Sequence, residues 1–326
     1  MAKEAHVVTE RGHGDSAALP DPRADLSLMV RAAWLYYEDG LIQADVARKL
    51  HVSRQTVSRL LEAARQRGIV RVEFDTRYLA AHRIATRLAE QSGLEDVIVV
   101  PTGGAGHNAG DRIAAAGAAY LRRFLRPGAV IGVGWGDTVA RTLSLIPGEL
   151  LTEVTLASIA GGITSITDAL TANAMLATHL RLLPAPVLVS TADLAAQLNN
   201  EASVRSVLDL AASADLTLTS VGGADPATAS AVRNALVTAE EAEAFRAMGG
   251  VGDMIGEWFD ARGEVLHEAT SARRIGLKLS TLREMPGVVC VAGGVEKVPA
   301  IRGAIAGRLI KTLITYEETA QALVEG

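Results

Sequence analysis

The N-terminal quarter of the chain alternates apolar and polar positions with the period of amphipathic α-helices. Between Ser27 and Glu38, apolar residues recur at helical spacing, and Asp39-Gly40 then forms a typical helix C-terminus. The same reasoning applied to the residues that follow predicts two more helices and then a half-exposed strand, where apolar and charged residues alternate. These further elements are predicted over residues 43–50, 53–67 and 69–74.

Beyond residue 94 the pattern changes to continuous apolar runs separated by helical stretches. Before this region, a helix is predicted over residues 79–91 and is interpreted as a linker or dimer contact. Apolar strands that alternate with helices predict a mainly parallel sheet with helices on both faces. The predicted strands are Asp96–Val100, Val130–Val133, Glu153–Ile159, Pro186–Ser190, Leu216–Val221, Val288–Val291 and Lys311–Ile314.

The chain has 326 residues, enough for about two domains, and 49% are hydrophobic but only 4% aromatic. Such a core of Ala, Val, Leu and Ile favours an α/β fold. Residues 1–25 are polar, contain no apolar stretch suited to a signal peptide, and are expected to be a disordered leader. We expect a helical domain over 26–77, a linker helix over 78–94 and an α/β domain over 95–326.

The charge distribution suggests where a polyanion would bind. The net charge is −5, yet residues 27–77 hold nine Lys and Arg against six Asp and Glu. From residue 78 onward the balance is 20 basic against 26 acidic residues. A modestly basic segment on an acidic body is what a DNA-binding domain would give.

The lone cysteine, Cys290, lies in an apolar run, and a buried thiol in a reducing cytoplasm fits it. No apolar run is long enough to span a membrane.

Residues 43–62 meet the joint requirements of a helix-turn-helix. Ala47 is small where two helices would cross, and Ser53 can cap the second helix. His51 stands at the turn position often filled by glycine, although histidine tolerates a left-handed backbone better than most residues. The apolar positions expected inside are Val46, Leu50, Val52, Val57 and Leu60. The polar side chains expected to meet DNA are Gln43, Ser53, Arg54, Gln55, Thr56, Ser58 and Arg59.

The alternative to a DNA-binding motif is a helical hairpin with a solvated polar face. Five polar side chains at the start of one helix favour the DNA interpretation. We expect Arg54 and Gln55 to contact bases, and Gln43, Ser58 and Arg59 to contact phosphates. Because so small a domain cannot select one genomic site alone, we also expect dimerisation on paired half-sites of double-stranded operator DNA.

Motifs that together are typical of one family are distributed along the whole chain. They are Ala33–Leu41, Ser53–Leu61, Gly68–Val70, Gly132–Thr138, Gly161-Gly162, Asn173, Gly252–Gly256, Phe259-Asp260, Ala292–Lys297 and Leu313–Ala320. In these motifs, from about Leu28 to Leu323, the chain resembles the SorC family of bacterial sugar-binding transcriptional regulators. The resemblance implies a Rossmann-like effector domain related to sugar-phosphate deaminases and isomerases, a bound sugar phosphate or related carbohydrate that controls DNA affinity, and assembly as dimers or tetramers.

The candidate effector site gathers glycine-rich turns and a few polar side chains. A glycine-rich turn between a strand and a helix lets backbone N–H groups approach an anion, although it is also simply a tight turn. The candidate residues are Gly134, Trp135, Gly136, Asp137, Thr138, Gly161, Gly162, Asn173, Asp253 and Lys297.

Each side chain in this set also has an ordinary structural role open to it. Trp135 can cover a sugar face or cap the core, and Lys297 can bind a phosphate or hydroxyl or remain a surface lysine. Asp253 can accept two sugar hydroxyls or cap a helix. Asn173 can bind a hydroxyl or be a satisfied core amide.

The chain departs from the family pattern at three places, and two of them bear on the ligand. Asp137 stands in the glycine loop, and Ile159-Ala160 precede Gly161-Gly162 where some sugar-phosphate binders carry arginine. Both lower the positive potential and favour an unphosphorylated sugar or polyol as the alternative effector. Tyr316 replaces the aspartate usual in the family, and nothing in the sequence explains it.

The rival function is a sugar-phosphate isomerase or deaminase. Isomerisation needs a base and a second group that moves protons at oxygen. Asp253 offers the first, but the sequence offers no convincing second partner, because His107 is the only one of the seven histidines that lies in a glycine-rich loop considered as a candidate site. No metal-ligand spacing appears, so we expect neither metal nor cofactor. A binding protein without catalytic residues is the simpler hypothesis.

Overall fold

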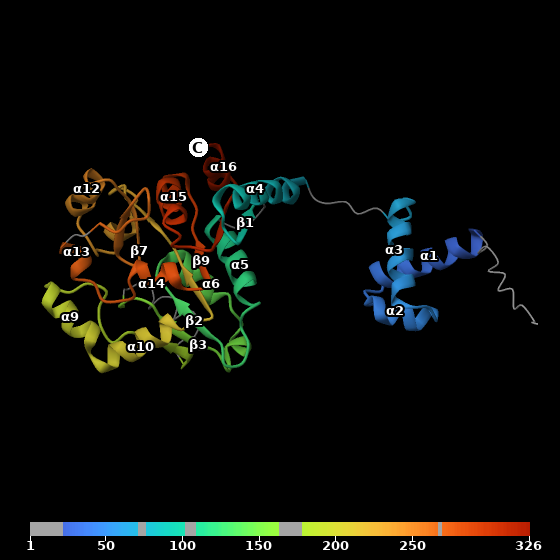
Figure 1. Ribbon diagram of the computed structural model, residues 1–326, viewed down its shortest axis with the longest axis horizontal. Helices are drawn as coiled ribbons and strands as arrows, with labels where there is room; N and C mark the ends of the chain where they lie inside the picture. Colours follow the sequence, from blue (N-terminus) through green and yellow to red (C-terminus); the bar gives the residue numbers. More distant parts are fainter. Residues whose placement is uncertain (1–21, 71–75, 102–108, 163–177, 267–268) are drawn as a thin grey trace, which may run out of the picture. The chain divides into compact units, whose positions relative to one another are not determined.

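The computed structural model describes residues 22–70, 76–101, 109–162, 178–266 and 269–326, and the chain divides into two compact units. The first, the head unit, is Met1–Phe74 and the second, the body unit, is Asp75–Gly326. Both are visible in Figure 1. No helix in the described ranges is long and apolar enough to cross a bilayer.

The head unit contains three helices, α1 (Pro22–Tyr37), α2 (Gln43–Leu50) and α3 (Arg54–Gln66). Helix α1 begins at Pro22, inside the range 1–25 that the sequence analysis gives to a leader, and a proline suits the first helical turn; residues 1–21 lie outside the described residues. The chain reverses at Gly40, whose φ is 66°. Of the expected strand over 69–74, residues 69 and 70 are not in a strand and the rest lies outside the described residues.

The crossing of α2 and α3 follows the predicted pattern. Ala47 is buried where the helices pack, together with the apolar positions Val46, Leu50, Val57 and Leu60, while Val52 is half-buried. His51 takes the left-handed conformation that the turn needs, with φ 55° and ψ 41°. The Ser53 hydroxyl accepts a hydrogen bond from the Thr56 backbone N–H at 3.0 Å, which confirms the predicted helix cap.

The body unit is built on a seven-stranded parallel sheet in the order β1-β10-β9-β5-β2-β3-β4. A smaller antiparallel sheet, β6-β7-β8, lies beside it and was not predicted. The strands are β1 (Asp96–Val100), β2 (Val130–Val133), β3 (Thr155–Ser158), β4 (Leu180–Arg181), β5 (Leu216–Thr219), β6 (Gly222–Gly223), β7 (Gly250–Met254), β8 (Glu257–Asp260), β9 (Val288–Val291) and β10 (Thr312–Tyr316).

One predicted strand is wrong. Residues 186–190 form only isolated bridges, Gly162 with Pro186 and Leu188 with Arg274, and the edge strand is β4 instead. Pro184 and Pro186 explain the error, because proline has no N–H to donate to a sheet ladder.

Helices cover both faces of the parallel sheet (Figure 1). Helix α4 packs on β1 and α16, so the helix predicted as a linker is part of the body unit. The body helices are α4 (Thr76–Ser92), α5 (Ala109–Leu121), α6 (Asp137–Ser144), α9 (Ala192–Asn200), α10 (Ala202–Ala212), α11 (Ser230–Arg233), α12 (Ala239–Ala247), α13 (Ala269–Ala272), α14 (Leu279–Glu284), α15 (Val298–Ala306) and α16 (Glu317–Glu325), with 3₁₀ turns η1 (Gly148–Leu151) and η2 (Val295–Lys297).

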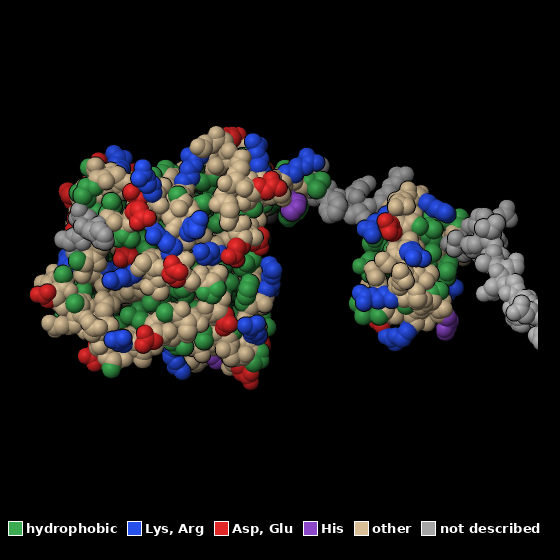
Figure 2. Space-filling model, viewed as in Figure 1, with side chains coloured by type: hydrophobic (Ala, Val, Ile, Leu, Met, Phe, Trp, Pro, Cys, Tyr) green, Lys and Arg blue, Asp and Glu red, His purple; other side chains and the backbone are tan. Residues whose placement is uncertain are grey.

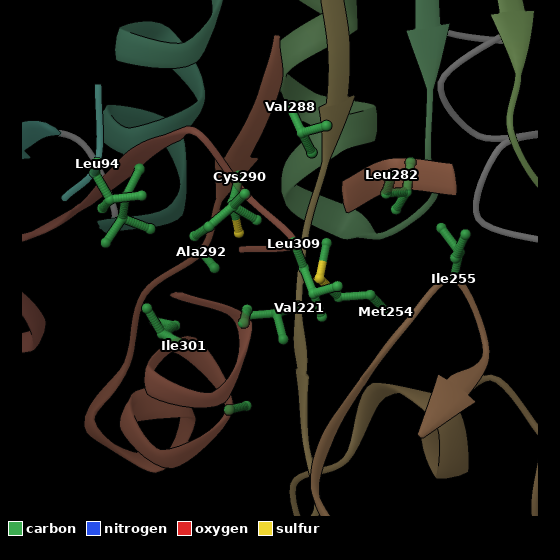
Figure 3. Packing of buried hydrophobic residues seen from close by; sticks show 14 of the residues in the cluster. Leu94, Val221, Met254, Ile255, Leu282, Val288, Cys290, Ala292, Ile301 and Leu309 are labelled. Carbon is green, nitrogen blue, oxygen red and sulfur yellow. The ribbon is translucent and has the colours of Figure 1, made fainter. Parts of the chain in front are cut away.

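Alternate residues of each strand enter two separate cores. In β9, Val288 and Cys290 face the core shared with α14 and α15, whereas Val289 and Val291 face the core under α5 and α6. Figure 3 shows the first of these cores around Cys290. Burial raises the pKa of the Cys290 thiol to about 12, so this cysteine serves as a small apolar residue.

Candidate DNA-binding and effector sites

Helix α3 leaves its predicted DNA-contacting side chains uncovered. Arg54, Gln55, Ser58 and Arg59 are all exposed, and none of them has an ion-pair or side-chain hydrogen-bond partner among the described residues. In Figure 2, Lys and Arg side chains are spread over the visible face of the head unit. The arrangement is that of a recognition helix free to enter a major groove.

The other predicted DNA residues are partly engaged within the head. The hydroxyls of Ser53 and Thr56 lie 2.8 Å apart, so these two side chains also shape the start of α3. Gln43 is the first residue of α2 and is half-buried. A side chain at a helix N-terminus is well placed to support a phosphate.

In the body unit, a cavity of about 180 Å³ opens where the carboxyl ends of β2, β5 and β9 lie side by side. Ligands in open α/β sheets bind at such a crevice. Five side chains and one glycine from the predicted set line it: Trp135, Gly136, Asp137, Thr138, Asp253 and Lys297.

The turn after β2 brings a helix N-terminus to the cavity. Gly136 precedes α6 with φ 131°, a conformation that favours glycine. Gly134 does not line the cavity; a Cβ there would come within 2.5 Å of the Thr219 hydroxyl, so its role is close packing of β2 on β5. Trp135 is 6% exposed, and its indole N–H is buried without a partner in the described part of the chain.

Asp253, near the end of β7, is the most unusual group in the cavity. It is 2% exposed, its Oδ2 accepts a hydrogen bond from the Gly256 N–H at 3.2 Å, and its Oδ1 is buried with no partner among the described residues. Desolvation raises the pKa of Asp253 to about 6, although the Gly256 hydrogen bond and the positive charge of Lys297 pull it down. A buried acceptor without a donor is costly, and a ligand hydroxyl would satisfy it.

A strained turn holds this carboxylate. Ile255 and Gly256 connect β7 to β8 with φ of 49° and 81°, and a positive φ is rare for a β-branched residue. Arg274, 5% exposed, donates from Nη1 to the Ile255 carbonyl at 3.3 Å and pairs with the buried Glu257 at 3.5 Å. Burial lowers the pKa of Arg274, and Glu257 opposes that shift.

Several lining residues were not predicted from the sequence, and Arg233 matters most. It lies on the short helix α11, 3.9 Å from the Asp137 carboxylate, and donates to the Thr228 carbonyl at 2.7 Å. Its charge offsets that of Asp137, which had argued against an anionic ligand. The sequence did offer one sign that this segment belongs to the cavity: Gly222-Gly223 follow a predicted strand, as the other glycines of the cavity do. The further unpredicted lining residues include Ser220, Gly222, Ser230, Ile255 and Glu296.

Besides Gly134, two more predicted residues do not line the cavity, and a third lies outside the described residues. Gly161 and Gly162 donate their N–H groups to the carbonyls of Ile275 and Ala185 and do not line it. A Cβ at Gly161 would collide with the backbone of Pro186, so this glycine allows close backbone packing. Asn173 lies outside the described residues.

Tyr316, unexplained by the sequence, supports the glycine loop after β9. Its ring packs against Gly293, where any Cβ would strike it, and the Gly294 N–H donates to the Thr319 hydroxyl at 2.8 Å. Partial burial raises the pKa of Tyr316. The tyrosine therefore fixes the loop that leads to Lys297.

Comparison with known proteins identifies both units. The sugar-binding domain family model matches residues 76–325, and the MarR family model matches residues 32–77. The transcriptional regulator LsrR of Enterobacter sp. (strain 638) is 34% identical over 301 residues, covering 91% of this chain and 92% of that protein. LsrR of Escherichia coli is 34% identical over 314 residues, covering 95% of this chain and 98% of its own length.

A solved structure gives the same result. The full-length sorbitol operon regulator SorC from Klebsiella pneumoniae superposes with a TM-score of 0.66 at 26% identity, covering 92% of this chain and 99% of that one. These relatives are named as transcriptional regulators, so the function is regulation through DNA rather than sugar-phosphate isomerisation or deamination. The chain belongs to the SorC family of transcriptional regulators, with a helix-turn-helix DNA-binding domain and a sugar-binding domain.

Proposed function

We propose that the cavity at the carboxyl ends of β2, β5 and β9 binds a small phosphorylated carbohydrate, and that this ligand controls operator affinity. The observation that carries the proposal is the buried Asp253 carboxylate. Its Oδ1 has no hydrogen-bond partner among the described residues, and Asp253 lines a cavity together with Lys297 and Arg233. Carboxylates accept hydrogen bonds from sugar hydroxyls, and the two cations suit a phosphate.

The remaining lining groups support the same ligand. The N-terminus of α6 favours an anion, and the unpaired Trp135 N–H can donate to a ligand oxygen. The cavity of about 180 Å³ limits the ligand to a small molecule. The unphosphorylated sugar or polyol is the alternative, favoured by Asp137 and Glu296, which also line the cavity.

On the DNA side, Arg54 and Gln55 would contact bases, whereas Gln43, Ser58 and Arg59 would position the phosphates. Two or four copies acting together in the cytoplasm would bring paired recognition helices to an operator. Ligand binding would change DNA affinity by the usual coupling of about 1–3 kcal/mol, or roughly 5–150-fold.

A thermal-shift screen of sugars, polyols and their phosphates tests the effector. A compound that binds only the folded protein raises its melting temperature. We expect a sugar phosphate to do so, with a smaller shift for the matching unphosphorylated sugar and none in an Asp253→Asn, Lys297→Ala double variant. An equal shift from the unphosphorylated sugar would favour the alternative ligand. A gel shift with the promoter region of the chain's own gene tests operator binding, and no retarded band would refute it.

A further inference from the structure

The Asp253 carboxylate is a buried negative charge that touches no positive side chain. It is 2% exposed, accepts a hydrogen bond from the Gly256 N–H, and forms no ion pair within the described part of the chain. With a pKa of about 6, the group is mostly ionised at pH 7. By contrast, the buried Arg274 is paired with Glu257 at 3.5 Å. A buried charge is costly unless it is both paired and hydrogen-bonded, so Asp253 still needs a cation.

Lys297 carries the opposite charge on the wall of the same cavity, but it does not contact Asp253. Its side chain is half-buried and forms neither an ion pair nor a hydrogen bond with any described residue. Its charge lowers the pKa of Asp253 from a distance too long for an ion pair. A negative and a positive group that line one cavity without meeting are complementary to a ligand that carries both charges.

Acidic side chains outnumber basic ones among the described residues of this cavity. Its acidic lining residues are Asp137, Asp253 and Glu296, and its basic ones are Arg233 and Lys297. Because Arg233 already lies 3.9 Å from Asp137, its charge is partly used within the protein. A phosphate alone would add negative charge to this excess of carboxylates, whereas a positive group on the same ligand would offset it.

Gly222 and Ser230 leave room for a charged donor beside Asp253. A Cβ at Gly222 would collide with Asp253 Oδ1 and lie 2.9 Å from the Ser230 hydroxyl, so the two oxygens border one small space. Asp253 Oδ1 has no donor in the described ranges, and the Ser230 hydroxyl makes no hydrogen bond there either. Both glycine and serine line the cavity. A group with several N–H bonds can donate to both oxygens at once.

We propose that the ligand of this cavity is an amino sugar phosphate or an amino polyol phosphate, whose protonated amine binds Asp253 and whose phosphate binds Lys297. The ammonium group gives Asp253 both a hydrogen-bond donor and a positive charge, whereas a hydroxyl supplies only the donor. A second N–H of the ammonium group donates to Ser230. This inference rests on the proposed binding of a phosphorylated carbohydrate at this site and specifies one further group of that ligand.

Calorimetric titration of the full chain with matched pairs of ligands tests the amine. Within each pair a single hydroxyl is replaced by an amine. The pairs are glucosamine 6-phosphate with glucose 6-phosphate, galactosamine 6-phosphate with galactose 6-phosphate, and glucamine 6-phosphate with sorbitol 6-phosphate. At pH 7 we expect the amino member of the best-binding pair to have a Kd lower by about tenfold or more, because hydrogen bonds to charged groups are the stronger ones.

The outcomes that overturn the amine differ from those that overturn the proposed function. Equal affinity within every pair, tighter binding of the hydroxyl members, or no binding by either member of any pair would show that no amine is recognised. The proposed function fails if no compound in the wider thermal-shift screen of sugars, polyols and phosphates raises the Tm. A sugar phosphate that binds without preference for the amine would therefore overturn this inference alone.

The Asp253→Asn variant assigns the preference to one side chain. Asparagine can still accept the Gly256 N–H but carries no charge, so we expect the two members of the best pair to bind within about twofold of each other. Asp137→Asn is the matched control, because Asp137 lines the same cavity with its side chain 62% exposed. The control should retain the preference. A preference that survives in Asp253→Asn, or that is lost equally in Asp137→Asn, would contradict the assignment.

Chemical changes to the ligand test its charge in the unaltered protein, whatever the variants do. The N-acetyl form of the preferred amino member keeps the nitrogen but cannot be protonated, so we expect it to bind more weakly by about tenfold or more. The N-methyl form adds bulk but stays charged, and its affinity should remain close to that of the free amine. An N-acetyl form that binds as tightly as the free amine, or an N-methyl form that loses as much affinity as the N-acetyl form, would refute recognition of the charge.

Discussion

Replacing Asp253 by asparagine should stabilise the protein at neutral pH while it impairs the effector response. The carboxyl has a pKa of about 6 in the folded protein against 3.8 for the ordinary group, because burial disfavours its charge. Asparagine keeps an oxygen that can accept the Gly256 N–H but carries no charge to bury. The variant thus removes the desolvation cost and, with it, a ligand contact.

The sign of the pH dependence follows from the raised pKa. The folded state binds the Asp253 proton more tightly than the unfolded state, so this group favours folding most below about pH 4 and loses that contribution as the pH rises through about 6. At 1.36 kcal/mol per pKa unit, the loss approaches about 3 kcal/mol at pH 7. The gain from Asp253→Asn should therefore grow from about 1 kcal/mol near pH 4.5 to about 3 kcal/mol at pH 7.

Denaturant unfolding of the full chain at a series of pH values measures this difference. Asp137→Asn is the matched control, since Asp137 lines the same cavity but its side chain is 62% exposed. Because its side chain is largely exposed, the control should change stability less than Asp253→Asn does at pH 7. An Asp253→Asn variant that is less stable at pH 7, or whose difference is flat with pH, would refute the claim that this carboxylate is desolvated and poorly paired.

Further variants test the DNA site and the cavity. Arg54→Ala should relax sequence preference at one operator position and cost about 1–3 kcal/mol there, as measured by competition with altered duplexes. Arg59→Ala should weaken binding to all sequences alike and reduce the salt slope by about one, and sequence-dependent weakening would reverse the roles assigned to the two arginines. Lys297→Ala should leave operator affinity unchanged and abolish the ligand response in a gel shift; a persisting response would mean that the effector binds elsewhere. Gly222→Ala should weaken effector binding in calorimetry, because the new methyl group would contact the Asp253 carboxylate, and normal binding would place the ligand away from β6.

The sequence predicted the local structure correctly where a single rule, such as an apolar run or a helix cap, decides the conformation. Six of the seven strands predicted for the body unit exist, because buried parallel strands are read as apolar runs, and the helix cap at Ser53 follows from its hydroxyl. The strand predicted over 186–190 fails because two prolines interrupt an otherwise apolar run. In α1, helical periodicity could not separate the buried residues from the exposed ones, since both sets are apolar. The buried residues include Met29 and Ala32, and the exposed ones include Val30 and Trp34.

The candidate site was predicted where residues follow a strand and missed where they come from short or distant elements. Asp253 and Lys297 were expected from motifs, whereas Arg233 lies on a four-residue helix with no sequence pattern of its own. Arg233 approaches Asp137 because α11 packs beside β6. A single sequence does not encode such a tertiary contact locally. The electrostatic argument from Asp137 and from Ile159-Ala160 therefore left out the positive charge that Arg233 brings to the cavity.

The turn at Ile255 shows why the site departs from local rules. Asparagine or glycine would relieve the left-handed backbone, which costs an ordinary residue roughly 1–2 kcal/mol. Ile255 is nevertheless 3% exposed and forms part of the cavity wall, so a polar or missing side chain would open the site to water. Arg274 holds the carbonyl on one side of the turn, and Asp253 holds the next N–H on the other. Two buried side chains, Arg274 and Asp253, therefore hold the strained turn in place. Because Asp253 is also the carboxylate proposed to bind the ligand, the strained backbone and the proposed binding site depend on the same residue.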